Sequence, residues 1–128
     1  MLSLDDLRAA VGRDLGTSPW VEVTPTALDQ FDAATGGGPE YLALSLTNRV
    51  LPEIVTVDAS AGLNVGTDSV RFPGPLAAGD RVRGHAVLSS CSEVSGGVQT
   101  VMRVTLEVAG RELPACVVDA VSRWLVND

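Results

Sequence analysis

The C-terminal half of the chain alternates between apolar and polar residues with the two-residue period of a β-strand. Residues 98–108 show this most clearly, since their even-numbered positions hold Val, Thr, Met, Val, Leu and Val. Val82 to Ser90 alternates in the same way, and Ser95-Gly96-Gly97 predicts a hairpin turn between the two segments. Ala109-Gly110-Arg111 predicts the next turn, and a last long strand is expected from Leu113 to Val126. This half is therefore expected to form an antiparallel sheet.

The N-terminal half shows helical spacing and the residues that begin helices. Ser3 precedes a short helix predicted over residues 4–11, and residues 20–23 alternate like a strand. Thr24-Pro25 is a typical helix start, because Thr caps free N–H groups and Pro needs no hydrogen-bond partner there. The helix that follows is expected to run to about Thr35.

Three glycines at residues 36–38 end that helix, since glycine tolerates the backbone angles of a helix stop. They lack the lysine and spaced glycine of a phosphate-binding loop, which excludes nucleotide binding. Pro39 opens a second helix, to about Leu51, with apolar residues around nearly its whole circumference. Such a helix is expected to be buried on all sides. After Pro52 we expect a kinked strand over residues 54–65 and a second strand over residues 69–72.

These elements predict one α+β domain over residues 1–128. A long antiparallel sheet is expected to wrap around a buried central helix at about residues 39–51. No repeat, low-complexity tract or linker divides the chain.

Composition removes several classes of function. The net charge is −7 with no basic cluster, so the chain is not expected to bind nucleic acid. All nine basic residues are Arg, which excludes Schiff-base catalysis by lysine. No apolar run is long enough for a membrane span, and the acidic N-terminus does not resemble a signal peptide; we expect a cytoplasmic protein. Cys91 and Cys116 are expected to be reduced, and a single His without a CxxC motif predicts no metal or other cofactor.

A family resemblance extends in order over almost the whole chain. It lies in Val11–Trp20, Thr24–Phe31 and Ala34–Gly36, in Tyr41–Leu46 of the central helix, in Leu63–Gly66, Val70–Pro73 and Pro75–Gly79, and in Pro114–Val118. These segments resemble the MaoC-like dehydratases, R-specific enoyl-thioester hydratases of the hot-dog fold. The resemblance implies a single hot-dog domain.

The same resemblance implies that the family's chemistry is missing. Family members carry an Asp just after the Thr-Gly that ends the first helix, and a His follows in the same loop; together they activate water and protonate the substrate. Gly37 stands at the Asp position here, and Gly38-Pro39 leads directly into the central helix. We therefore expect a divergent member without the Asp–His loop, and a substrate pocket opened by its loss.

Three other sets of titratable side chains could in principle supply acid–base chemistry. His85, the only histidine, is favoured as a surface or barrel residue, because nothing in the sequence gives it a partner. Asp32 lies one helical turn before the missing Asp and is favoured as a solvated acid, although it could face the vacated pocket. Asp68 and Arg71 are expected to form a structural salt bridge.

The opened pocket predicts a bulky hydrophobic ligand, either polyketide-like or an acyl thioester. Holding such a chain in a reactive fold would promote its cyclisation without an acid–base pair. Tyr41, Asn64 and Asp32 are the candidate catalytic residues, the first two as hydrogen-bond donors to a carbonyl. The candidate ligand-binding residues are expected to line the same pocket: Phe31, Thr35, Leu42, Ser45, Val65 and Trp20.

Two other functions stay open. The chain could be the non-catalytic partner subunit of a heteromeric enoyl-thioester hydratase, or a residual hydratase that uses Asp32 with His85. A homodimer is expected, or a heterodimer with an active hot-dog subunit, because hot-dog domains cover exposed strands by pairing.

Overall fold

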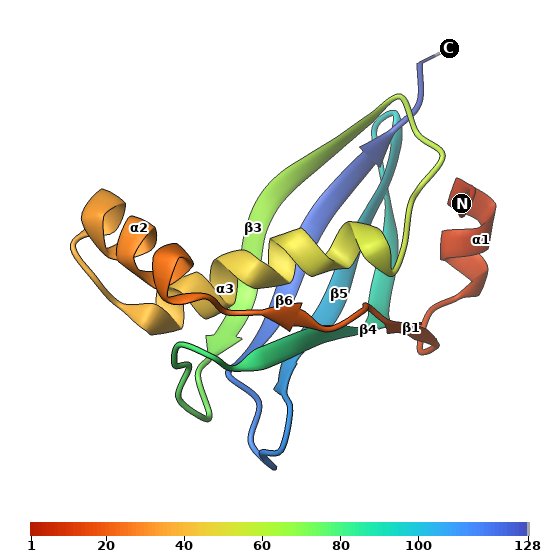
Figure 1. Ribbon diagram of the computed structural model, residues 1–128. Coiled ribbons are helices and arrows are strands. Elements are labelled where there is room, and N and C mark those ends of the chain that lie inside the picture. Colours follow the sequence, from red (N-terminus) through yellow and green to blue (C-terminus); the bar gives the residue numbers. More distant parts are fainter. Residues whose placement is uncertain (128) are drawn as a thin grey trace.

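The computed structural model describes residues 1–127. One antiparallel sheet has the strand order β1-β4-β5-β6-β3, with β2 also paired to β4. In Figure 1 the sheet curves around α3, with α2 beyond one end of α3 and α1 near the other. The elements are α1 (Leu4–Ala9), β1 (Asp14–Thr17), β2 (Val21–Glu22), α2 (Pro25–Thr35), α3 (Pro39–Val50), a 3₁₀ turn (Leu51–Glu53), β3 (Ala61–Arg71), β4 (Arg81–Val94), β5 (Gly97–Val108) and β6 (Cys116–Leu125).

The alternation in the C-terminal half is confirmed. In β5 the even-numbered residues 98–108 are all buried, and Met102 and Leu106 are among the largest fully buried side chains. The β4–β5 hairpin turns at Ser95-Gly96, as its glycines predict. One continuous core joins the inner faces of β4, β5 and β6 to α3.

Only one face of α3 is buried, so the expectation of a helix covered on all sides is wrong. Leu42, Ala43 and Val50 pack on the sheet, whereas the Tyr41 side chain is 58% exposed. A curved sheet can contact only the side of a helix that faces it, and no other described element covers the opposite side of α3. The contact is close at Gly84 of β4, where an added Cβ would overlap the Cγ2 of Val50.

The middle of the chain also differs from the prediction. Residues 54–60 form no strand, because the 3₁₀ turn at Leu51–Glu53 leads into an irregular segment. β3 is instead one strand, Ala61–Arg71, where the pattern suggested two. Two register shifts, between Asn64 and Gly66 and between Thr67 and Ser69, disturb its alternation and explain the error. β3 pairs with β6 on one side only and forms an edge of the sheet.

The helix boundaries follow the predicted signals. Ser3 forms a capping box with Asp6 at the start of α1, and the Thr24 hydroxyl accepts a hydrogen bond from the N–H of Ala27 at the start of α2. Gly36, Gly37 and Gly38 have φ angles of 83°, 111° and 86°, a left-handed run that favours glycine. α2 contains no fully buried residue and protrudes as a lobe in Figure 1. No helix in residues 1–127 has both the length and the hydrophobicity needed to cross a bilayer.

Candidate functional site

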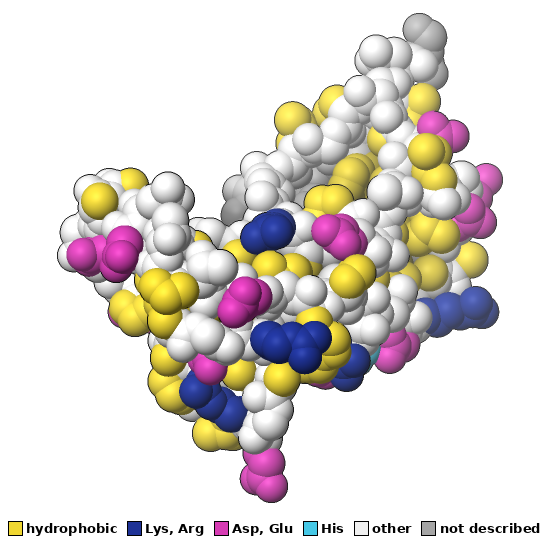
Figure 2. Space-filling view, viewed as in Figure 1, with side chains coloured by type: hydrophobic (Ala, Val, Ile, Leu, Met, Phe, Trp, Pro, Cys, Tyr) yellow, Lys and Arg dark blue, Asp and Glu magenta, His cyan; other side chains and the backbone are white. Residues whose placement is uncertain are grey.

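A groove of about 280 Å³ lies between α3 and the inner face of the sheet beside edge strand β3. Its floor is apolar and its rim is polar. Figure 2 shows the face that carries α3, hollowed beside the α2 lobe and with hydrophobic side chains in the hollow. The groove is lined by Leu44, Ser45, Thr47, Asn48 and Leu51 of α3 and the turn after it, by Asn64, Gly66 and Thr67 of β3, and by Val104, Val118, Ala120 and Ser122 of β5 and β6.

The lining of the groove contains no acidic, basic or histidine side chain. Two of its hydroxyls are engaged within α3: Ser45 Oγ donates to the Tyr41 carbonyl at 3.0 Å, and Thr47 Oγ1 donates to the Leu44 carbonyl at 2.6 Å. The side-chain amides of Asn48 and Asn64 form no hydrogen bond with another residue in 1–127. The groove can thus hold an apolar group and form hydrogen bonds, but it offers no side chain for acid–base catalysis at neutral pH.

The structure brings together only some of the predicted site residues. Ser45 and Asn64 line the groove from opposite sides. Leu42 is buried beneath α3 in the core, and Val65 lies on β3 without lining the groove. Tyr41 lies outside the groove, where its ring meets Phe72 edge-on with centroids 5.8 Å apart. The prediction missed Asn48, which could have been found because it lies one helical turn after Ser45.

Phe31 and Asp32 line a separate cavity of about 260 Å³ between α2 and the start of α3, with Leu76 among its other walls. Thr35 does not line this cavity; its hydroxyl donates to the Phe31 carbonyl at 2.6 Å, with the Gly37 carbonyl 3.2 Å away as a second acceptor. These residues therefore belong to the α2 lobe. The prediction of one shared pocket is wrong here, because α2 folds to the end of α3 instead of over its length.

Trp20 lies on the outer face of the sheet, away from α3. The guanidinium groups of Arg83 and Arg81 lie over its ring, 4.6 and 5.7 Å from the centroid. In β4 the inward positions are Val82 and Gly84, so both arginines point outward. Trp20 therefore lies outside the α3–β3 groove, although the sequence predicted it beside Ser45 and Asn64; it directly precedes β2, which pairs with β4 in the sheet.

His85 also lies on the outer face and has a partner that the sequence did not reveal. Its Nε2 lies 2.7 Å from Oδ2 of Asp14. Asp14 begins β1, and Thr17, at the end of the same strand, pairs with His85. The hydrogen bond from His85, together with one from the Gly16 N–H, lowers the pKa of Asp14. Asp32 lies in the α2 lobe, so the structure does not assemble an Asp32–His85 pair. Asp68 and Arg71 form no ion pair with each other or with another residue in 1–127.

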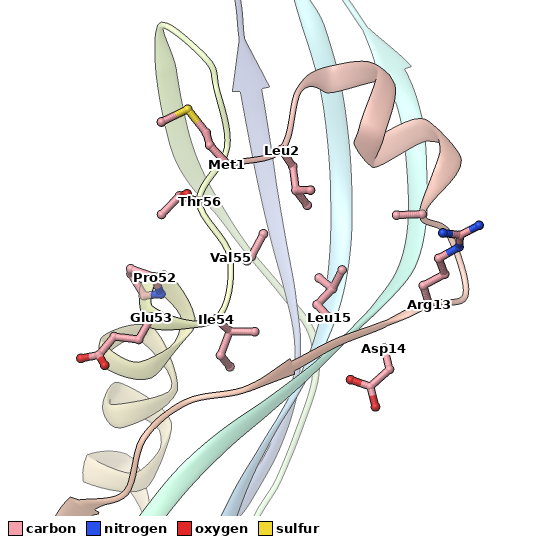
Figure 3. A pocket seen from close by; sticks show the side chains of 11 residues that line it. Met1, Leu2, Arg13, Asp14, Leu15, Pro52, Glu53, Ile54, Val55 and Thr56 are labelled. Atoms are coloured by element: carbon pink, nitrogen blue, oxygen red, sulfur yellow. The ribbon is translucent and has the colours of Figure 1, made fainter.

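A hollow of about 440 Å³ lies between the N-terminal segment and the turn after α3. In Figure 3 the side chains of Leu2, Leu15 and Ile54 meet in it, while Glu53 points away. Asp14 points to the far side of β1, toward His85. No described acid–base pair converges on this hollow, and none of its residues is among the predicted site residues.

The remaining reactive side chains are dispersed. Cys91 and Cys116 are free thiols, as predicted, and burial raises the pKa of Cys116 to about 11. Within residues 1–127 no group of three or more His, Cys, Asp or Glu side chains is placed to hold a metal ion.

Comparison with known proteins gives matches over nearly the full length. No protein-family model matches the chain. It is 32% identical to 3-hydroxyacyl-thioester dehydratase Z of Mycobacterium tuberculosis over 96% of each chain. It is 34% identical to nodulation protein N of Rhizobium leguminosarum bv. viciae, over 89% of this chain and 86% of that protein.

Solved structures confirm the hot-dog fold. A MaoC-like dehydratase from Rhodospirillum rubrum matches with a TM-score of 0.69 and 13% identity, covering 93% of this chain and 94% of that one. An (R)-hydratase from A. caviae matches with a TM-score of 0.59 and 15% identity, over 89% and 96% of the two chains.

Within the aligned region, dehydratase Z has more residues than this chain. The alignment spans 145 residues, whereas 96% of this 128-residue chain is about 123 residues, so the relative carries about 22 residues that this chain lacks. The sequence identity extends over nearly the whole length, and the antiparallel sheet wraps around α3. Together these two findings establish the family of the chain. The chain belongs to the MaoC-like dehydratase family of hot-dog proteins.

Proposed function

We propose that this protein binds the acyl chain of a hydrophobic acyl thioester or polyketide-like intermediate in the α3–β3 groove and promotes its cyclisation without hydrating it. The observation that carries the proposal is the neutral lining of the groove, which combines an apolar floor with amide and hydroxyl groups. The name of dehydratase Z supports an acyl-thioester ligand for a related protein.

Hydration needs an acid and a base within hydrogen-bond reach of the reacting carbons. His85 and Asp14 are bound to each other on the outer face, and Asp32 lies in the α2 lobe. We propose that part of the length difference from dehydratase Z lies at the junction of residues 36–39, where the family resemblance places the Asp and His. The proposal therefore assigns no hydratase activity to this chain.

Ring closure of a poly-β-ketone chain forms a C–C bond between an α-carbon and a carbonyl carbon. The α-carbon gives up its acidic proton to water and the carbonyl oxygen takes a proton from water, so the protein contributes positioning alone. Holding the reacting carbons of a flexible chain together lowers the activation barrier by on the order of 7–11 kcal/mol in favourable cases. The volume of about 280 Å³ lies just below the ~300–1,000 Å³ of pockets for drug-sized ligands. We therefore expect the groove to hold one acyl segment, while the rest of a bulky ligand lies over the open side of α3.

The test is incubation of the protein with a linear poly-β-ketoacyl thioester, followed by chromatography of the products. We expect cyclised product to form faster than in buffer. Ser45→Trp should abolish the acceleration by filling the groove, whereas Arg49→Trp, on α3 outside the groove, should preserve it. Product formation equal to buffer, or hydration of a crotonyl thioester by the wild-type protein, would contradict the proposal.

A partner-subunit role is the second candidate, and edge strand β3 favours it. Its backbone is paired on one side only, and Leu63 and Val65 are 48% and 50% exposed. A long unpaired edge that also exposes apolar side chains is suited to pairing with a second strand. We propose a homodimer through β3, or a heterodimer with an active hot-dog subunit. Light scattering should give twice the chain mass for the homodimer; a monomer that binds a neighbouring hot-dog gene product would favour the heterodimer.

A further inference from the structure

The α3–β3 groove contains a pair of asparagines that face it from its two walls. Asn48 is on α3, one turn after Ser45, and Asn64 is on β3. Both side chains are exposed to solvent, and neither amide is hydrogen-bonded within residues 1–127. Each amide has two N–H donors and one acceptor oxygen available for a ligand.

Other polar groups of the groove are less available. The hydroxyl hydrogens of Ser45 and Thr47 are donated to carbonyls of α3 itself. The rest of the polar rim consists of the neutral hydroxyls of Thr67 and Ser122. The two asparagines therefore supply most of the side-chain hydrogen-bond donors that the groove offers to a ligand.

The neutral lining also decides which ligands the groove excludes. A carboxylate or phosphate would lose its water shell there without meeting a positive charge, because none of the nine arginines lines the groove. A fully reduced alkyl chain would bury its carbons but leave both amides unpaired where it displaces their water. A neutral chain with a carbonyl or hydroxyl oxygen meets both requirements.

We propose that Asn48 and Asn64 act together as specificity-determining residues that select neutral, oxygenated acyl chains, such as 3-oxoacyl groups, over saturated or carboxylate-terminated chains. This inference rests on the proposed function of the groove and specifies its substrate class. In physical terms, the amides of the two walls bind the oxygen of the acyl chain, while Leu44, Leu51 and Val118 contact its carbons.

The test uses three N-acetylcysteamine thioesters of equal chain length: 3-oxooctanoyl, octanoyl and 7-carboxyheptanoyl. This small thiol carries no phosphate, so binding reports the acyl chain alone. Isothermal titration calorimetry should show the 3-oxo ligand bound about tenfold more tightly than octanoyl, the ratio given by a lost hydrogen bond of ordinary strength. The carboxylated ligand should bind most weakly.

The variants Asn48→Leu and Asn64→Leu separate the hydrogen bonds from the shape of the groove. Each should weaken binding of the 3-oxo ligand about five- to tenfold and leave octanoyl binding unchanged or slightly tighter. Asn127→Leu is the matched control, because Asn127 lies outside the groove beyond the end of β6. Circular dichroism and thermal unfolding of each variant verify that the fold is kept.

The outcomes distinguish the inference from the proposed function. Equal affinity for the 3-oxo and octanoyl ligands, or an unchanged ratio in both leucine variants, overturns the inference and leaves acyl binding in the groove intact. Absence of binding by all three thioesters overturns both. Loss of octanoyl binding in the correctly folded leucine variants also overturns the inference, because it would assign the asparagines a structural role.

Discussion

The two faces of the sheet carry opposite kinds of chemistry. The inner face, with α3 against it, has a groove without a charged side chain. The outer face holds the His85–Asp14 pair and the Trp20 ring beneath two arginines. Alternation along β4 produces this contrast directly, because Gly84 and Ala86 face α3 while Arg83 and His85 face away. The titratable groups of this strand are thus separated by the sheet from the α3–β3 groove.

The largest effect on stability should come from comparing substitutions at two neighbouring residues on opposite faces of β4. Gly84→Ala places a methyl group against Val50 and should lower the free energy of unfolding by about 2–3 kcal/mol, because the packed contact between helix and sheet has no room for it. His85→Ala removes a hydrogen bond to a carboxylate that is 63% exposed and should lower the free energy of unfolding far less, because solvent screens this pair. Urea titrations of the two variants measure both values. Equal destabilisation would show that the close contact at Gly84 does not limit packing.

A second comparison concerns ligand size. Leu44→Ala enlarges the groove and should improve binding of a longer or branched acyl thioester, relative to the wild type's preferred one, by roughly four- to fifteenfold, the effect of burying one or two further methylene groups at about 0.8 kcal/mol each. Trp20→Ala removes a larger side chain from the outer face and should leave the preference unchanged. Calorimetry over an acyl series provides the measurement. A changed preference for acyl-chain length in Trp20→Ala would place ligand binding on the outer face of the sheet and contradict binding in the groove.

The smallest effect concerns pH. The pKa of Asp14 lies below its ordinary value of about 3.8, so the stability linked to this carboxylate is present above that pH and is lost as the pH falls through the lowered value. Asp14→Asn should therefore be slightly less stable than the wild type at pH 7, and the difference should vanish as the pH falls below about 4, which flattens the acid limb of the unfolding curve. Acyl binding in the groove, which has no titratable side chain, should stay constant from pH 5 to 9 in both proteins. Thermal unfolding and calorimetry at several pH values test the two expectations.

The sequence predicted those parts of the fold that depend on local chemistry. The alternation of residues 98–108, the cap at Thr24 and the glycine stop at residues 36–38 are all present in the structure. β3 was divided in two because its register shifts interrupt the alternation, and they are visible only against its partner β6. Strand β1 was not predicted as a strand, because its four residues are too few for a clear period.

The candidate site was harder to predict than the fold. Ser45 and Asn64 both line the groove. Their closeness could be predicted because periodicity indicates which helix and strand positions lie near the core. Trp20 was misplaced because its face depends on how β2 pairs with β4, a long-range contact that the local pattern does not contain. Phe31 and Asp32 were misplaced because the direction of α2 is set by the backbone angles of Gly36, Gly37 and Gly38, which glycine leaves open.

The strand order also has a consequence for synthesis on the ribosome. β3 (Ala61–Arg71) is made early, yet its only partner in the sheet is β6 (Cys116–Leu125), the last element of the chain. At typical translation rates of about 5–20 residues per second, β3 therefore waits for seconds with both edges unpaired. A nascent chain halted before Cys116 has the helix wall of the groove but no seated strand to oppose it. The groove is thus completed only in the last step of folding, when the C-terminal strand enters the sheet between β5 and β3.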